Sequence, residues 1–313
     1  MKVSDDEISN HSSGFLTLLG RPNVGKSTLV NKLVGQKIAI TSPVAQTTRN
    51  RLRAILTSTN SQIILIDTPG IHKPHHLLGQ RLVKSARRSI GDVDMILLIF
   101  DASSPPGRGD EYIVNLLKDQ NKPVIVVLNK IDLINYSLQK IRSEEYALLI
   151  KDSPWLIIKS SAINGDGCNK IIEESIKLMP IGPRLYPEDM VCDQPEKVII
   201  GELIREQILH KTIEEVPHSV AVRVENINEK EIKRQNKNSF LTIISATILV
   251  ERKSQKGILI GKGGKMLKEI GTDARAQIKK LFNGSVHLEL FVKVMPKWRS
   301  KSNDLTELGY RGD

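Results

Sequence analysis

The sequence predicts two α/β domains, a doubly wound, mostly parallel sheet followed by a smaller α+β domain. Three observations support this prediction. Apolar runs of about five to eight residues alternate with helical patterns, as in a sheet of buried strands. A glycine-rich segment at residues 20–27 lies between one such run and a helical pattern. Prolines and charges gather at residues 179–189, and the strand and helix patterns restart after them.

The 313 residues are enough for a core in each domain. We expect an N-terminal extension at residues 1–12, a first domain at 13–180, a linker at 181–196, a second domain at 197–300 and a tail at 301–313. The extension and the tail match no assignable pattern, and both could be disordered. The sequence contains no signal peptide and no apolar stretch of transmembrane length, so we expect a cytoplasmic protein.

Residues 20–27 read G-R-P-N-V-G-K-S and fit the phosphate-loop pattern G-x-x-x-x-G-K-[ST] at every fixed position. A predicted strand at 15–19 precedes the loop, and a predicted helix at 27–34 follows it. Glycines let backbone N–H groups turn toward phosphate oxygens, and the helix N-terminus adds its positive dipole end. We therefore predict a nucleoside triphosphate site. Its loop residues are Gly20, Asn23, Val24, Gly25, Lys26, Ser27 and Thr28.

Four side chains or backbone groups have predicted roles around the phosphates. Lys26 reaches the β- and γ-phosphates, and the Ser27 hydroxyl binds Mg²⁺. The predicted strand at 63–66 ends in D-T-P-G, where Asp67 holds Mg²⁺ directly or through water. Gly70 lets the next backbone N–H meet the γ-phosphate.

Two later motifs select the base. A predicted strand at 123–128 leads into N-K-I-D, which comprises Asn129, Lys130 and Asp132. A carboxylate at Asp132 accepts from guanine N1–H and the exocyclic amine together, and adenine would leave that carboxylate unpaired. Losing such a buried partner discriminates by about 10⁴. A strand at 156–160 leads to Ser161 and Ala162, whose backbone can meet the guanine oxygen. The ordered motifs predict GTP and GDP as the ligands.

Residues 46–49 read Q-T-T-R and lie in a polar stretch between the phosphate loop and Asp67. A threonine here resembles the switch residue that closes on Mg²⁺ and the γ-phosphate in GTPases. Thr48 is favoured over Thr47 because the related motif has the threonine directly before an arginine; the alternative is two solvated loop threonines. The predicted catalytic residues are Lys26, Thr48, Asp67 and Gly70, and the predicted Mg²⁺ ligands are Ser27, Thr48 and Asp67.

Ile71 stands where Ras-like GTPases have the glutamine that orients the attacking water. Isoleucine forms no hydrogen bond to water, so we predict slow intrinsic hydrolysis unless backbone, a partner or an ion positions the water. Asn23 is the candidate for an ion site, because related GTPases with asparagine there can use K⁺.

Beyond the linker we predict helices at 198–209, 265–270 and 272–281, and strands at 220–224, 241–250 and 286–294. Residues 261–264 read G-K-G-G between helical segments. A KH domain uses such a G-x-x-G loop to bring backbone close to about four nucleotides of single-stranded nucleic acid. The predicted RNA contacts are Gly261, Lys262, Gly263, Gly264, Lys256 and Lys265.

The distribution of charge supports this interpretation of the second domain. Residues 197–313 hold 22 Lys and Arg against 14 Asp and Glu, a net charge of +8. Residues 1–196 hold 24 against 21, a net charge of +3. Most of the positive charge therefore lies where nucleic acid would dock. The alternative is an ordinary helix–helix turn on a merely soluble basic surface.

The whole chain resembles the Era family of GTPases from about residue 13 to residue 300. The resemblance rests on G-R-P-N-V-G-K-S-T, A-Q-T-T-R, D-T-P-G-I-H, N-K-I-D and S-A in the first domain. In the second domain it rests on E-E-V-P-H-S-V-A-V and V-E-R-K-S-Q-K-G-I-L-I-G-K-G-G. It implies a type II KH topology and a nucleotide-dependent rearrangement of the two domains. It also implies a Mg²⁺-dependent GTPase whose KH domain binds small-subunit ribosomal RNA near its 3′ end and assists small ribosomal subunit assembly.

The same resemblance implies peripheral contact with anionic membrane, which the sequence does not decide; nothing in it requires more than a monomer. Two other classes of function stay open: a GTPase acting on transfer RNA or the large subunit, and an RNA-binding module that holds GTP without turnover. We expect free thiols at Cys168 and Cys192, and a core position rather than base stacking for Trp298. Histidines 72, 75 and 76 are interpreted as a solvated loop rather than a metal site.

Overall fold

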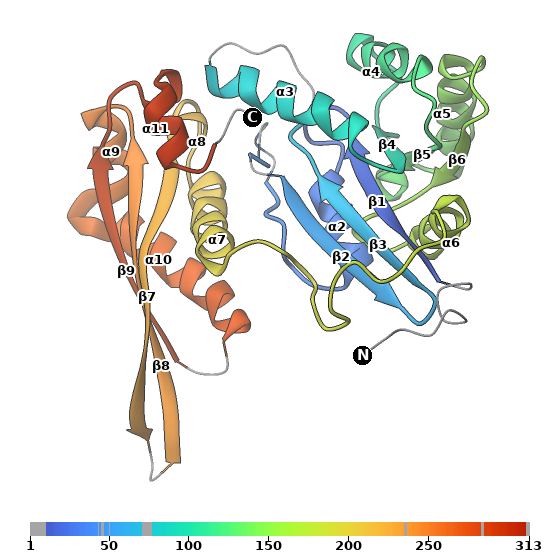
Figure 1. Ribbon diagram of the computed structural model, residues 1–313. Helices are drawn as coiled ribbons and strands as arrows, with labels where there is room; N and C mark the ends of the chain where they lie inside the picture. The colour runs from blue at the N-terminus through green and yellow to red at the C-terminus, as the bar shows by residue number, and fades with distance from the viewer. Residues whose placement is uncertain are drawn as a thin grey trace.

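The computed structural model describes residues 11–42, 44, 47–49, 51–70, 77–234, 237–282 and 285–310. It consists of two domains that lie side by side (Figure 1). The first contains a six-stranded sheet in the order β2-β3-β1-β4-β5-β6, in which β2 alone runs antiparallel to its neighbour. Its strands are β1 (Ser12–Leu19), β2 (Leu52–Ser58), β3 (Ser61–Asp67), β4 (Met95–Asp101), β5 (Val124–Asn129) and β6 (Leu156–Lys159). The predicted doubly wound, mostly parallel sheet is confirmed.

Helices cover both faces of this sheet, which explains why its central strands are apolar without alternation. The helices are α2 (Lys26–Val34), α3 (Leu77–Gly91), α4 (Arg108–Lys118), α5 (Tyr136–Leu149) and α6 (Cys168–Leu178). One core lies under α2 and α6, and the other lies under α3, α4 and α5. Parallel strands bring the carboxyl ends of β1, β3, β4 and β5 to one edge of the sheet, where the predicted motifs begin.

The second domain contains a three-stranded sheet in the order β7-β8-β9. Its strands are β7 (Ala221–Arg234), β8 (Lys237–Val250) and β9 (Ser285–Val294), and its helices are α7 (Glu196–Lys211), α8 (Val216–Ser219), α9 (Lys253–Ile260) and α10 (Lys265–Ile278). The β7–β8 pair is antiparallel and extends past the end of β9, so it forms the long ribbon at the bottom of Figure 1. Helices α7, α9 and α10 cover one face of the sheet around a shared core. The topology agrees with the expected KH domain.

The prediction of two helices, at 265–270 and 272–281, is wrong. One helix runs from Lys265 to Ile278, and a short 3-10 turn (Lys279–Leu281) follows it. Gly271 lies inside the helix, where a Cβ would be 3.4 Å from Leu290. Tertiary packing on the sheet therefore outweighs the weak helix propensity of glycine.

The expectation that the C-terminal tail could be disordered is wrong for residues 301–310. A short helix, α11 (Ser302–Glu307), lies in this segment, and Leu305 and Tyr310 are buried. Trp298 is fully buried and donates from Nε1 to the Ser219 carbonyl at 2.9 Å, which confirms its core position. Residues 1–10 of the expected extension lie outside the described residues. Among those described, no helix is both long and apolar enough to span a bilayer.

The linker is bound to the first domain along the β2–β3 edge. Gln62 accepts from the backbone N–H groups of Leu185 and Tyr186 at 2.7 and 2.8 Å. Its amide donates to the Tyr186 carbonyl at 2.9 Å. Further along, Ala54 forms an isolated bridge with Cys192, and both cysteines are free thiols. The linker therefore fixes where α7 begins.

Candidate functional site

The phosphate loop has the backbone conformation that its glycines predict. Gly25 adopts φ 99° directly before α2, and a Cβ there would lie 2.3 Å from the Asn129 Nδ2 atom. Asn23 also adopts a positive φ, at 65°. The turn therefore directs the N-terminus of α2 into a cavity of about 340 Å³, within the usual size of a ligand pocket. The described residues lining it include Asn23, Gly25, Lys26, Ser27, Thr28, Thr48, Gly70 and Lys130.

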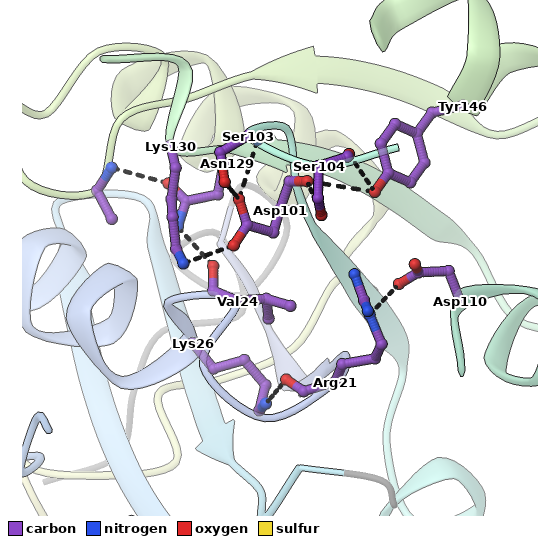
Figure 2. Close-up of polar contacts among 11 residues, drawn as sticks. Arg21, Val24, Lys26, Asp101, Ser103, Ser104, Asp110, Asn129, Lys130 and Tyr146 are labelled. Atoms are coloured by element: carbon purple, nitrogen blue, oxygen red, sulfur yellow. Dashed lines mark hydrogen bonds and ion pairs between the residues drawn. The ribbon is translucent and has the colours of Figure 1, made fainter. Parts of the chain in front are cut away.

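Lys26 is the buried cation of this cavity. Its Nζ donates to the carbonyl of Gly20 at 3.2 Å. It also donates to the carbonyl of Arg21 at 2.8 Å (Figure 2). Burial lowers the pKa of Lys26 to about 8, although the nearby Asp67 carboxylate opposes the shift. A phosphate group at this site would therefore supply the negative charge that stabilises the ammonium form.

Three predicted oxygen ligands converge beside Lys26. The Ser27 hydroxyl lies 2.8 Å from the Thr48 hydroxyl and 2.7 Å from Asp67 Oδ2, and Thr48 Oγ1 lies 3.1 Å from the same carboxylate oxygen. The Thr47 hydroxyl instead donates to the Val44 carbonyl at 2.6 Å. The structure thus brings Thr48, not Thr47, to the cluster.

The chemistry of this cluster fits Mg²⁺. Burial raises the pKa of Asp67, although hydrogen bonds from Ser27 and Thr48 and the charge of Lys26 oppose the shift. Asp67 Oδ1 is buried and has no hydrogen-bond partner among the described residues. Hydroxyl and carboxylate oxygens are the donors that Mg²⁺ prefers, and it usually completes its shell with phosphate oxygens and water. The described residues contain no cluster of three His, Cys, Asp or Glu side chains that could hold a metal ion.

Gly70 fixes the distance between two loops. A Cβ on Gly70 would lie 2.7 Å from the Pro22 nitrogen and 2.8 Å from its Cα. Because both contacts are backbone atoms, the D-T-P-G turn can approach the phosphate loop only with glycine here. The residues after it that carried predictions, Ile71, His72, His75 and His76, lie outside the described residues, as does Gln46.

The two base-recognition motifs are joined by Asn129. Its Nδ2 donates to the Val24 carbonyl at 2.8 Å (Figure 2). Its Oδ1 accepts from the Ala162 N–H at 2.9 Å. The buried amide therefore connects the phosphate loop, the N-K-I-D motif and the S-A motif. Asp132 is exposed in the short 3-10 turn (Ile131–Leu133), and Ser161 accepts from the Asn164 N–H at 3.2 Å.

The sequence interpretation missed two acidic partners of the loops. Lys130 adopts φ 66° and donates to Asp101 Oδ2 at 2.6 Å, at the end of β4. Although burial opposes it, hydrogen bonds from Lys130 and Ser103 lower the pKa of Asp101. Arg21 in the phosphate loop donates to Asp110 of α4 at 2.8 Å (Figure 2). The signal for Asp101 was present, because the apolar run at 95–100 ends in this acid, as the run at 63–66 ends in Asp67.

The G-K-G-G loop lies between α9 and α10 and contains three left-handed glycines. Their φ angles are 70° at Gly261, 60° at Gly263 and 80° at Gly264. A Cβ at Gly261 would lie 2.8 Å from Met266 Cβ, whereas Gly263 and Gly264 have open space around them. Lys262 and Lys265 are exposed, and Lys256 is half-buried. The loop therefore presents backbone and charge to solvent.

A groove of about 450 Å³ begins at this loop and follows α10 and the edge strand β9. The sequence interpretation did not predict it, because its residues come from two separate elements. It is lined by Gly264, Leu267, Lys268, Gly271, Thr272, Arg275, Leu288 and Leu290. Leucines form its apolar wall and the two cations flank it, a combination that suits unstacked bases and a phosphate backbone.

Comparison with known proteins supports the assignment of a GTPase domain and of a KH domain. The family model of a 50S ribosome-binding GTPase matches residues 15–130, and the KH domain model matches residues 215–299. GTPase Era of Crocosphaera subtropica is 56% identical over 299 residues, which cover 96% of this chain and 92% of that protein. GTPase Era of Rippkaea orientalis is 54% identical over the same shares of both chains.

Two solved structures have the same architecture. Era in complex with MgGDPNP and nucleotides 1506–1542 of 16S ribosomal RNA is 38% identical, with a TM-score of 0.89 over 96% of this chain and 99% of that chain. An Aquifex aeolicus Era variant bound to GDP.AlF4⁻ is also 38% identical, with a TM-score of 0.88 over the same shares. With these identities over nearly its full length, this chain belongs to the Era family of GTPases.

Proposed function

We propose that this GTPase is a molecular switch that binds single-stranded small-subunit ribosomal RNA near its 3′ end and assists small ribosomal subunit assembly. The observation that carries the proposal is the full-length likeness to the Era structure that contains MgGDPNP and a 16S ribosomal RNA fragment. That likeness spans both domains and their junction. A similarity confined to the first domain would have supported only nucleotide binding.

The phosphate side of the proposed reaction depends on the cluster beside Lys26. Lys26 donates to the β- and γ-phosphate oxygens, and the N–H groups at the start of α2 cradle them. Ser27, Thr48 and Asp67 would hold Mg²⁺, which when bound neutralises charge on the phosphate oxygens. Thr48 belongs to the part of the site that orders with GTP and loosens after release of phosphate.

The base side of the proposal depends on Asp132 and Asn129. Asp132 accepts from the guanine N1–H and amine, while the backbone of Ser161 and Ala162 meets the guanine oxygen. Asn129 keeps these two motifs at a fixed distance from the phosphate loop through its bonds to Val24 and Ala162. The site selects guanine over adenine because adenine would leave Asp132 unpaired.

The proposed RNA site combines the G-K-G-G loop with the groove along α10 and β9. Lys262 and Lys265 contact phosphates, and Leu288 and Leu290 contact bases through apolar surface. The low aromatic content of the chain, 4%, agrees with recognition through backbone and aliphatic contacts.

A matched pair of glycines tests this assignment. Gly264 has φ 80° and ψ 8°, and Gly35 at the end of α2 has φ 75° and ψ 7°, both with open space around them. Gly264→Asp should weaken binding of an oligonucleotide copying the 3′ end of the cognate 16S ribosomal RNA by at least about tenfold, because a carboxylate repels the phosphate backbone. Gly35→Asp should change it less than about twofold.

Fluorescence anisotropy with this oligonucleotide and a scrambled one, each with a GTP analogue present, measures the effect. Equal affinity for both RNAs, unchanged in Gly264→Asp, would require abandoning the ribosomal assignment. A single-turnover GTPase assay with Asp67→Asn as the inactive control tests whether the protein hydrolyses GTP at all. No turnover with RNA or small subunits present would favour an RNA-binding module that holds GTP without hydrolysis.

Two smaller parts of the proposal have their own tests. Asn23 lies in the phosphate loop at φ 65°, where a K⁺ ion would add positive charge to the γ-phosphate region. Faster hydrolysis in K⁺ than in Na⁺ buffer is expected, and equal rates would remove this role. Contact with anionic membrane stays a prediction, which co-sedimentation with phosphatidylglycerol vesicles would test.

A further inference from the structure

Helix α7 of the second domain contacts described residues that lie between α2 and Thr48. Glu206 is fully buried on this helix and accepts from the backbone N–H of Thr41 at 2.8 Å and from its hydroxyl at 3.2 Å. The other carboxylate oxygen accepts from Lys37 Nζ at 2.6 Å. One acidic side chain of the second domain therefore fixes the first part of this segment.

The two residues that flank Thr48 are also bound to the second domain. Arg205, fully buried on α7, donates to the carbonyl of Thr47 and to the Glu202 carboxylate. On the other side of Thr48, the Arg49 guanidinium is buried. It donates to the Val220 carbonyl at 2.5 Å and to those of Pro217 and His218 at 3.2 Å.

Apolar contact adds to these polar bonds. Ile40 is 4% exposed and belongs to the core cluster formed mainly by α7, α10 and the second sheet. The described residues between 37 and 49 are therefore held by a buried carboxylate, two buried guanidinium groups and a shared core. Their own domain contributes the hydrogen bonds of Asn31 to the backbone of Ile38 and Ala39. It also contributes the bonds of Thr48 to Ser27 and Asp67.

The position of Thr48 is therefore determined from both domains. In a GTPase switch the γ-phosphate and its metal normally supply the contacts that order this loop, and ordering a loop costs conformational entropy. When another domain already holds the flanking residues, ordering the loop costs less free energy on GTP binding. GDP has no γ-phosphate and does not need Thr48, so it should not depend on these contacts.

We propose that Glu206 and Arg205 of the second domain are positioning residues of the GTP site. They hold Thr41 and Thr47 so that the Thr48 hydroxyl stays beside Ser27 and Asp67 and GTP is favoured over GDP. The inference rests on the role of Thr48 in the proposed function, and it does not depend on which RNA the protein binds.

The test compares two nucleotides on the full chain. Affinities of the fluorescent analogues mant-GMPPNP and mant-GDP are measured with Mg²⁺ present and without RNA. Glu206→Ala should weaken mant-GMPPNP about tenfold, within the usual range for coupling between sites, and change mant-GDP less than about twofold. A merely structural role would move both affinities together.

Matched variants identify the contact responsible. Glu206→Gln keeps an oxygen acceptor for Thr41 and should recover most of the mant-GMPPNP affinity. Lys211→Ala breaks an ion pair with Asp273 of 2.8 Å at the C-terminal end of α7, and should change neither affinity. Lys37→Met removes the ion pair with Glu206 from the side of the first domain. Because the Lys37 side chain is 43% exposed, this variant should fold.

Each outcome decides the inference. Equal weakening of both nucleotides in Glu206→Ala, or no change in a variant that folds normally by circular dichroism, would overturn it. If Glu206→Ala does not fold, Lys37→Met and Thr41→Val decide in its place, and unchanged mant-GMPPNP affinity in both would overturn it. A selective effect together with failure of the RNA experiments would leave this inference standing and remove the ribosomal proposal.

Discussion

The two domains meet at two junctions of different chemistry. Near Thr48 the junction is rich in polar contacts: besides the buried Ile40, the buried side chains of Arg49, Arg205 and Glu206 form directional hydrogen bonds across it. Near α3 the junction is apolar, and a core cluster joins Leu78 and Leu82 to the C-terminal segment. In Figure 1 α11 of this segment lies near the start of α3.

The difference lies in how each junction responds to movement. Buried charged hydrogen bonds need one geometry, and breaking them leaves an unpaired charge, so the polar junction has few acceptable arrangements. Apolar contacts scale with buried area and tolerate small displacements. The apolar junction is therefore suited to holding the domains together, and the polar one to sensing the position of the segment beside the phosphates.

Trp298 belongs to both junctions. On one side its ring stacks against Tyr310, with centroids 5.9 Å apart, within the apolar cluster. On the other side the Arg49 guanidinium lies 5.9 Å from the ring centroid. A change at either junction can therefore reach the other through this indole.

The largest expected effect comes from the apolar junction. Leu305 is fully buried in the cluster, and Leu305→Ala should lower the free energy of unfolding by about 2–5 kcal/mol, as truncation in a packed core does. Urea unfolding followed by Trp298 fluorescence in a Trp155→Phe background measures it. The ratio of mant-GMPPNP to mant-GDP affinity should stay unchanged.

The matched control lies on the same short helix. Asn303 is exposed, and Asn303→Ala should change the unfolding free energy by less than about 0.5 kcal/mol. A shifted nucleotide ratio in Leu305→Ala, at unchanged affinity for GDP, would mean that the apolar junction also senses nucleotide.

Arg49→Lys probes the polar junction with the charge kept. One ammonium cannot reproduce the forked contacts to the carbonyls of Val220, Pro217 and His218, so the unfolding free energy should fall by about 1.5–3 kcal/mol. The preference for mant-GMPPNP should fall as well. The comparison variant is Arg81→Lys at the apolar junction, which changes a half-buried arginine bound to the Tyr310 carbonyl and Ser302. If both variants lower the nucleotide preference equally, the division between the junctions fails.

The phosphate contact of Lys26 should be independent of both junctions. Burial lowers its pKa from 10.5 to about 8, and bound phosphates favour the ammonium form. Affinity for GDP should therefore fall as pH rises through 8, by about fourfold between pH 7 and pH 8.5. The free energy of unfolding has the opposite pH dependence. Below pH 8 the buried ammonium of Lys26 lowers this free energy, and the loss disappears as pH rises toward 10.5.

Isothermal titration calorimetry across this pH range checks the prediction. GMP, which has no β-phosphate for Lys26, serves as the control and should show a flatter profile. The slope for GDP should be the same in Leu305→Ala and Glu206→Ala. A flat profile for GDP would mean that Lys26 stays charged throughout.

The phosphate and guanine motifs could be predicted from the sequence because each is a short contiguous string at the end of an apolar run. Parallel strands bring such strings together whatever the rest of the chain does. Even the choice of Thr48 over Thr47 agrees with the geometry, since Thr48 lies beside Ser27 and Asp67.

The domain junctions could not be predicted, because their partners lie far apart in the sequence. Glu206 and Thr41 are separated by 165 residues, and their contact depends on how two folded domains pack. Helix α7 is buried from Ile200 to Leu209 with one intermediate position at Glu202, so it lacks the one-sided apolar pattern that reveals a surface helix. The signal that was present is the charged pair Arg205 and Glu206, which lies between the apolar pairs at 203–204 and 208–209 of the helix.

The smallest effect is expected from the charged pair at the surface of the apolar junction. Arg223 of β7 pairs with Glu307 of α11, and their side chains are 33% and 57% exposed. Because water screens such a pair, a double-mutant cycle with Arg223→Ala and Glu307→Ala should give a coupling free energy below about 1 kcal/mol, which decreases as salt is added. A coupling above about 2 kcal/mol would mean that α11 is held by charge as well as by Leu305. The apolar junction would then need one geometry, as the polar junction does, and the two could no longer be assigned separate roles.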